Sequence, residues 1–149
     1  MGRWMEVVRA RPTQGQRSHD VTYEKHAIGE LAPHPLMHAF SGLCQANLGK
    51  RESIRRQFPM LEAVGLHSNR YVDENLWLDA VEVSRLFEEF RRLRRICRRE
   101  EFITGLDGPA TYEAWRSAER REDFEAWLDE IEALLGKAAS SGCAVRLML

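Results

Sequence analysis

Long apolar runs, paired cysteines and an N-terminal signal are all missing from this 149-residue sequence. No apolar stretch approaches the roughly 18 residues that a membrane-spanning helix needs, and the first residues lack the apolar core of a signal peptide. The three cysteines are an odd number and form no CxxC motif, so the sequence encodes neither a disulfide framework nor a zinc ribbon. We therefore expect a cytoplasmic protein that does not bind a membrane.

Motifs that define common enzyme classes are also missing. The sequence has no P-loop, no GxGxxG and no EF-hand pattern, so nucleotide and calcium binding have no support and no cofactor is expected. Ser41 stands in FSGL and not in the GxSxG turn of serine hydrolases. Cys44 can be combined with His19 and Asp20 as a triad, but its position in a predicted helix favours burial as a small apolar group. These absences favour a non-enzymatic protein.

The composition indicates a folded domain with charges of both signs. Hydrophobic residues make up 44% and charged residues 30% of the chain, with four tryptophans, which is typical of a globular protein. The length fits one domain over residues 1–149. The net charge of −1 hides an asymmetry, because residues 1–71 carry ten bases and six acids whereas residues 72–149 carry twelve bases and seventeen acids. This balance is unlike that of a typical nucleic-acid-binding domain.

The most regular pattern lies in the range Leu76 to Phe102, where apolar residues recur at three- and four-residue steps that only an α-helix aligns on one face. These residues are Leu76, Val83, Leu86, Phe87, Phe90, Leu93 and Cys97. Asp73 is the expected N-cap, and the glycines and proline of residues 104–109 form a turn. We predict a second long helix over residues 110–138, folded back on the first as an antiparallel hairpin.

Three shorter helical segments are expected before the long hairpin. The first begins near Leu36 and closes at Gly49, the second stops before Pro59, and the third ends at Gly65 as its C-cap. We expect these helices to pack across the hairpin.

Two strands are predicted at opposite ends of the sequence. Residues 3–10 alternate in part and end before Pro12, and residues 143–149 are almost entirely apolar, so the two segments should pair in a small sheet. Residues 12–33 are polar and form a long loop, with a second short strand over residues 21–28. The expected fold class is therefore a helix-dominated α+β domain.

Six arginines in the range Arg91 to Arg99 are the strongest charge feature. The planar guanidinium suits phosphates as well as protein carboxylates. In the predicted hairpin Arg91 comes level with Asp123, so the acidic segment 122–132 would neutralise part of the cluster. Glu88 and Arg92 are also spaced as a helical i,i+4 ion pair. Nucleic-acid binding through this cluster is the second alternative. It ranks below the others because no aromatic residues are interleaved with the arginines for stacking on bases.

Another protein is the expected partner, and four residues are the candidates to bind it. Arg94 and Arg98 belong to the basic cluster, while Tyr71 and Trp77 are aromatic residues of the kind enriched in interfaces. Trp77 lies off the apolar stripe of the predicted long helix, which favours an exposed position. The oligomeric state does not follow from the sequence.

Four of the five histidines fall between His19 and His38, which raises the first alternative, a metal-dependent hydrolase. Its ligands would be His19, His26, His34 and His38, with carboxylates nearby in the sequence. The spacing is not specific: HPLMH at residues 34–38 differs from the HExxH of metalloproteases, and Pro35 places His34 at the start of a helix. Surface or helix-capping histidines account for the same pattern.

The layout resembles that of small bacterial immunity-type proteins, which neutralise a cognate toxin by binding it. The similar features are the N-terminal strand, the YVDENLWLD entry at residues 71–79 into a long charged helix, the acidic helix around Trp127 and the closing VRLML strand. The resemblance covers most of the chain. It implies a non-enzymatic inhibitor that acts by charge and shape complementarity, and it assigns no role to a particular residue.

Overall fold

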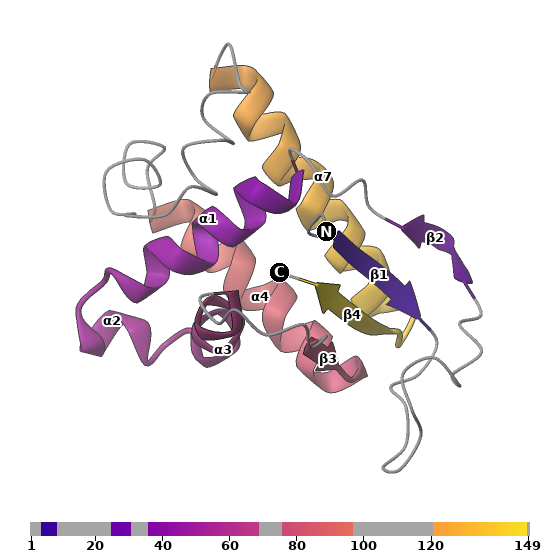
Figure 1. Ribbon diagram of the computed structural model, residues 1–149, viewed down its shortest axis with the longest axis horizontal. Helices are drawn as coiled ribbons and strands as arrows, with labels where there is room; N and C mark the ends of the chain where they lie inside the picture. Colours follow the sequence, from indigo (N-terminus) through magenta and orange to yellow (C-terminus); the bar gives the residue numbers. More distant parts are fainter. Residues whose placement is uncertain (1–3, 9–24, 31–35, 69–75, 97–120, 149) are drawn as a thin grey trace.

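The computed structural model describes residues 4–8, 25–30, 36–68, 76–96 and 121–148 (Figure 1). Their elements, in chain order, are β1 (Trp4–Val8), β2 (Lys25–Glu30), α1 (Leu36–Leu48), α2 (Glu52–Arg55), α3 (Pro59–Ser68), β3 (Leu76–Leu78), α4 (Ala80–Ile96), α7 (Arg121–Ser140) and β4 (Ala144–Met148). The helix-dominated α+β class predicted from the sequence is confirmed. In the view of Figure 1, α1, α2 and α3 gather on one side of α4 and α7, and β1, β2 and β4 lie on the other.

The described strands form one antiparallel sheet in the order β2-β1-β4-β3. Strands β1 and β4 pair along their whole length, from Trp4 opposite Met148 to Val8 opposite Ala144. The predicted pairing of the two terminal strands is therefore confirmed. Strand β2 lies at the other side of β1 and begins and ends later than the predicted strand over residues 21–28.

Strand β3 was not expected, and it corrects the start of the long helix. Leu76 was predicted to begin the helical stripe with Asp73 as N-cap, but the segment Leu76–Leu78 is an edge strand paired with β4. Helix α4 begins only after Asp79. The Glu82 N–H donates to Asp79 Oδ1 at 2.8 Å and the Asp79 N–H donates to Glu82 Oε1 at 3.1 Å, a reciprocal capping box that fixes this start.

Alternate side chains of the central strands enter the core. Met5 and Val7 of β1 and Val145 and Leu147 of β4 are buried together with the apolar faces of the helices. Helix α4 packs on β3 and β4, and α7 packs on β2. The core positions predicted for α4 that fall in the helix are confirmed as buried or half-buried, namely Val83, Leu86, Phe87, Phe90 and Leu93.

Helices α4 and α7 run antiparallel, as predicted, but in a different register. Arg91 was expected level with Asp123, whereas its Nε atom lies 3.8 Å from Glu132, nine residues further along α7. The reason is that the buried face of α7, including Leu128 and Ile131, must meet the core. The turn predicted over residues 104–109 lies outside the described residues.

Two glycines have different roles in the helices: one permits close packing and the other ends a helix. Gly65 was predicted to cap a helix that ends there, but α3 continues to Ser68; a Cβ atom at Gly65 would lie 2.9 Å from the Cys44 carbonyl oxygen of α1. Gly65 therefore permits close helix packing. Gly142 has φ of 65°, and the Cys143 N–H donates to the Ala138 carbonyl at 2.9 Å, which closes α7 as a Schellman motif.

Candidate functional site

Helix α4 presents four sides with different chemistry. Its core side carries the buried Leu86, Phe90 and Leu93. One flank faces α7 and carries Arg94, and the opposite flank faces α3 and carries Glu89. The remaining side faces solvent. This outer side, with the flank toward α3, is the candidate site.

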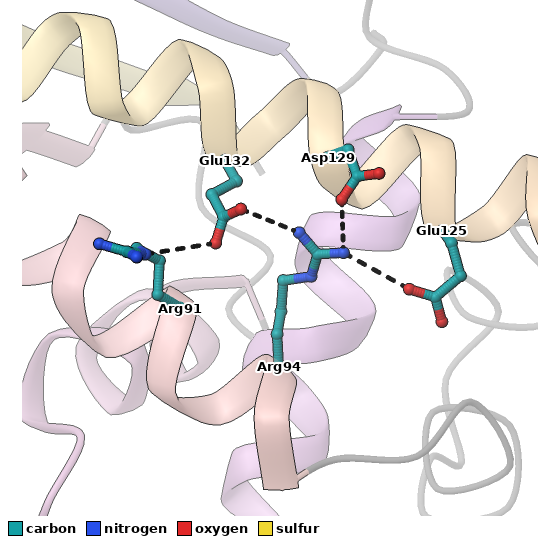
Figure 2. Close-up of polar contacts among 5 residues, drawn as sticks. All are labelled: Arg91, Arg94, Glu125, Asp129 and Glu132. Atoms are coloured by element: carbon teal, nitrogen blue, oxygen red, sulfur yellow. Dashed lines mark hydrogen bonds and ion pairs between the residues drawn. The ribbon is translucent and has the colours of Figure 1, made fainter.

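The flank toward α7 is neutralised within the chain. Figure 2 shows the Arg94 guanidinium pointing at three carboxylates of α7, with its nitrogens 2.8 Å from Asp129, 3.3 Å from Glu132 and 3.4 Å from Glu125. The Arg94 side chain is only 15% exposed. Because its charge is matched inside the molecule, we do not assign Arg94 to a partner-binding surface, although the sequence made it a candidate.

Several other predicted site residues lie outside the described part of the chain, namely Tyr71, Arg98, His19 and His34. His26 lies on β2 and His38 on α1, but the structure does not describe their side chains. Among the described residues, no group of three or more histidines, cysteines or carboxylates could hold a metal ion. The metal-dependent hydrolase therefore stays a prediction.

Trp77 lies in strand β3 and not in a helix, so its predicted helical position is wrong. It is half-buried, opposite Arg146 of β4, whose guanidinium carbon lies 5.6 Å from the centre of the indole ring. Arg146 Nη2 also lies 2.8 Å from Oε2 of the buried Glu6 on β1. The three side chains form a row across one face of the sheet, which gives Trp77 a structural role there.

The outer side of α4 is a stripe of exposed residues at four- and three-residue steps, namely Val81, Arg85, Glu88, Arg92 and Arg95. Within the described segments, Arg85 and Arg95 form no ion pair, and neither does Glu88 with Arg92 despite the predicted i,i+4 spacing. We call these five residues the basic stripe, because they include three arginines and only one acidic residue.

Arg92 is held in place by neutral groups instead of an acid. Its Nη2 atom donates to the Gln57 carbonyl at 3.2 Å, and its guanidinium carbon lies 5.2 Å from the centre of the Phe58 ring. A cation over an aromatic face is attracted by the ring quadrupole. These contacts hold Arg92 in position; it forms no ion pair among the described residues, although its charge acts on the nearby Glu89.

A groove of about 470 Å³ follows the stripe on the side of α3. Its lining residues are Gln57, Pro59, Ser84, Arg85, Glu88, Glu89 and Arg92. Glu89 is the buried residue among them, at 3% exposure. Both of its carboxylate oxygens accept the Met60 backbone N–H at 3.0 Å, so Glu89 caps the first turn of α3 from another helix.

Burial raises the pKa of Glu89 to about 7, because the ionised carboxylate loses hydration there. The Met60 N–H and the positive charges of Arg92 and Arg85 lower this pKa and offset only part of the effect. Burial, with a contribution from the negative charge of Glu89, also raises the pKa of the Cys44 thiol well above its usual range. Cys44 is therefore a protonated core residue, as its predicted burial implied, and not a nucleophile.

Sequence reasoning missed Glu89 although a signal was present. Glu89 follows Leu86 by three residues and precedes Leu93 by four, so its side chain belongs to the apolar stripe of the helix. A carboxylate inside an apolar stripe indicates burial with a dedicated partner. The partner, the start of α3, could not be identified from spacing along α4.

Comparison with protein-family models, curated proteins and solved structures finds no match to this chain. None of the described helices combines the length and the apolar character needed to cross a membrane. The geometry of the described residues is thus the basis for a functional proposal.

Proposed function

We propose that this chain is a non-enzymatic protein-binding module that uses the basic stripe of α4 to bind an acidic surface of another protein. The observation that carries this proposal is the contrast between two sides of one helix. Arg94 is matched by three carboxylates of α7, whereas Arg85 and Arg95 have no ion-pair partner among the described residues. Arg95 lines the hollow that contains these carboxylates, but it is exposed and does not pair with them. If the immunity-type resemblance holds, the partner is a cognate toxin with an acidic binding surface.

Three properties support a protein partner over a nucleic acid. The basic stripe contains Glu88, so it is a surface of mixed charge and not a uniformly basic one. The neighbouring helix α7 exposes Glu130, which adds negative charge to that helix. Exposed Val81, at 62%, offers an apolar contact at the start of the stripe. Mixed charge with an apolar end suits a protein surface better than a uniformly charged backbone.

The chemistry of such a site is recognition and not catalysis. Exposed charges arranged to oppose charges on a partner speed association and disfavour wrong partners, and salt screens them. Binding through the basic stripe should therefore weaken as ionic strength rises. The groove beside the stripe adds a concave surface into which a partner side chain can enter.

The test uses poly-L-glutamate as an acidic probe, with poly-L-lysine as the probe of opposite charge. We expect poly-L-glutamate to bind at low salt and to shift the backbone NMR signals of α4 around Arg85 and Arg95. Reversing both charges, Arg85→Glu with Arg95→Glu, should weaken binding at least about tenfold, since each lost pair is worth about 1 kcal/mol. The matched control is Lys137→Glu, an exposed charge reversal on α7, which should change affinity less than about twofold.

Two results would overturn the proposal. One is a loss of binding in the Lys137→Glu control as large as the loss in Arg95→Glu alone, because only net charge would then matter. The other is tighter binding of a labelled DNA or RNA duplex than of poly-L-glutamate at the same salt concentration, which would assign the stripe to nucleic acid.

A further inference from the structure

The groove beside the basic stripe holds a buried acid between two arginines, and this arrangement bears on how an acidic partner is bound. We infer that the groove between α3 and α4 binds one carboxylate side chain of the acidic partner near Arg85 and Arg92, and that Glu89 takes up one proton when this carboxylate binds. This inference rests on the proposed function.

The dimensions of the groove suit a side chain. Arg85 and Arg92 are two helical turns apart, about 10 Å along the axis of α4, with Glu88 on the turn between them. The groove beside these residues gives an incoming carboxylate access to both guanidinium groups from the side of α3. The volume of about 470 Å³ exceeds that of one acidic side chain. Arg92 is already oriented by the Gln57 carbonyl, and a guanidinium has five N–H donors, so one hydrogen bond to Gln57 does not exhaust it.

The charge of the groove depends on the state of Glu89. With Glu88 and Glu89 both ionised, the two carboxylates cancel Arg85 and Arg92 and the lining has no net charge. With Glu89 protonated, the lining has a net charge of +1. An incoming carboxylate is therefore attracted to the protonated form, and by linkage its binding raises the proton affinity of Glu89.

The other groups that face Glu89 do not compete for this proton. From α1 the Cys44 thiol remains protonated, and from α3 the contact is the Met60 backbone N–H. Gln57 is not an ionisable residue, and from α4 itself the positive charges of Arg85 and Arg92 act on Glu89. A protonated Glu89 retains a carbonyl oxygen for the Met60 N–H and gains an O–H that can donate to the incoming carboxylate. The proton comes from solvent and no covalent bond changes.

Burial places the pKa of Glu89 at about 7, so about half of the unbound protein carries this proton at neutral pH. If only the protonated form accepts the carboxylate, the apparent affinity scales with the protonated fraction. That fraction falls about tenfold between pH 6 and pH 8, and the affinity for poly-L-glutamate should fall about tenfold with it.

The experiment is isothermal titration calorimetry of the full chain with poly-L-glutamate at pH 6, 7 and 8, in two buffers of different ionisation enthalpy. The expected result at pH 7 is uptake of about half a proton per site, because half of Glu89 is already protonated. Glu89→Gln, neutral at every pH, should abolish both the uptake and the pH dependence. The matched control Glu88→Gln removes a charge from the same groove and should leave the proton uptake unchanged.

Three outcomes separate this inference from the proposed function. If poly-L-glutamate binds at α4 without proton uptake, or with uptake that persists in Glu89→Gln, the inference fails while the proposed function stands. If poly-L-glutamate does not bind, the proposed function itself fails. If free glutamate binds as tightly as the polymer, the groove serves a small carboxylate and not a protein partner, which overturns the partner class.

A direct measurement covers the case in which Glu89→Gln does not fold. The carbon-13 NMR signal of the Glu89 carboxyl reports its titration in the native protein. Addition of poly-L-glutamate should move its midpoint to higher pH. A midpoint that stays constant, or that moves to lower pH, contradicts the inference.

Discussion

Glu89 combines burial with a hydrogen bond to the backbone of another helix, and this combination explains both its position and its ionisation. The carboxylate stabilises the start of α3 through Met60, but its charge loses hydration at 3% exposure. Cys44 illustrates the opposite case: its burial followed from its place on an apolar helical face, and the structure confirms it. The burial of Cys44 follows from the apolar face of one helix, whereas the burial of Glu89 depends on the packing of α3 against α4.

Replacing Glu89 by glutamine should change how stability depends on pH. The folded pKa of about 7 lies above the ordinary value of 4.5, so the folded state binds more protons than the unfolded state between these values. The free energy of unfolding should therefore fall as pH rises from about 4.5 to about 7, by up to about 3 kcal/mol. Glu89→Gln should remove this decline.

Urea unfolding of both proteins at pH 5, 6 and 7.5 measures this effect. Glu88→Gln, at the exposed neighbouring position, serves as the control and should follow the wild-type pH dependence. A Glu89→Gln protein that loses as much stability as wild type between pH 5 and pH 7.5 would show that Glu89 titrates in the ordinary range.

At the level of elements, the boundary between β3 and α4 shows where sequence patterns are ambiguous. The Leu76–Leu78 segment fits a helical stripe and also a short strand, and the place beside β4 decides between them. The capping box formed by Asp79 and Glu82 was readable in the sequence, yet Asp73 fitted the longer helical pattern. Helix α3 similarly extends past Gly65. The glycine at this position permits close packing on α1 and does not end the helix.

Gly65→Ala should destabilise the protein, although alanine favours helices. An added methyl group would lie 2.9 Å from the Cys44 carbonyl oxygen, so α1 and α3 would have to separate. We expect a loss of about 1 to 3 kcal/mol, as for other overpacked sites. Chemical denaturation of the variant and wild type measures the change.

The control for this substitution is Ala133→Gly on the exposed side of α7, which reports the effect of the same methyl group on helix propensity alone. It should cost about 1 kcal/mol. A stability gain of that size in Gly65→Ala would mean that α1 and α3 are not in close contact.

At the level of the whole molecule, the helix-dominated class and the pairing of the terminal strands followed from apolar patterns that are local in the sequence. The register of α4 against α7 did not, because it depends on which side chains meet in the core. The sequence put forward Arg94 within the arginine cluster, whereas the exposed arginines of α4 that form no ion pair among the described residues are Arg85, Arg92 and Arg95. Spacing identifies a helical face but not the neighbour that covers it.

Removing residues 143–149 should abolish cooperative folding. Strand β4 lies between β1 and β3, and its Val145 and Leu147 are fully buried, so its loss would expose the core and leave two strand edges unpaired. We expect a compact state with helical far-ultraviolet circular dichroism but without near-ultraviolet signal or a sharp urea transition. A truncated chain that unfolds in one sharp transition would contradict this central role of β4.

The position of β4 beside β1 also determines when the sheet can be completed as the chain is made. The ion pair between Glu6 and Arg146 joins residues 140 positions apart. At about 5 to 20 residues per second, a ribosome needs on the order of ten seconds to add β4 after β1. Helices form in about a microsecond, so α1, α3 and α4 can form while β1 still lacks its central partner. We therefore expect the nascent chain to pass through a helical stage in which the edge of β1 that later pairs with β4 is still open to chaperones and to other chains.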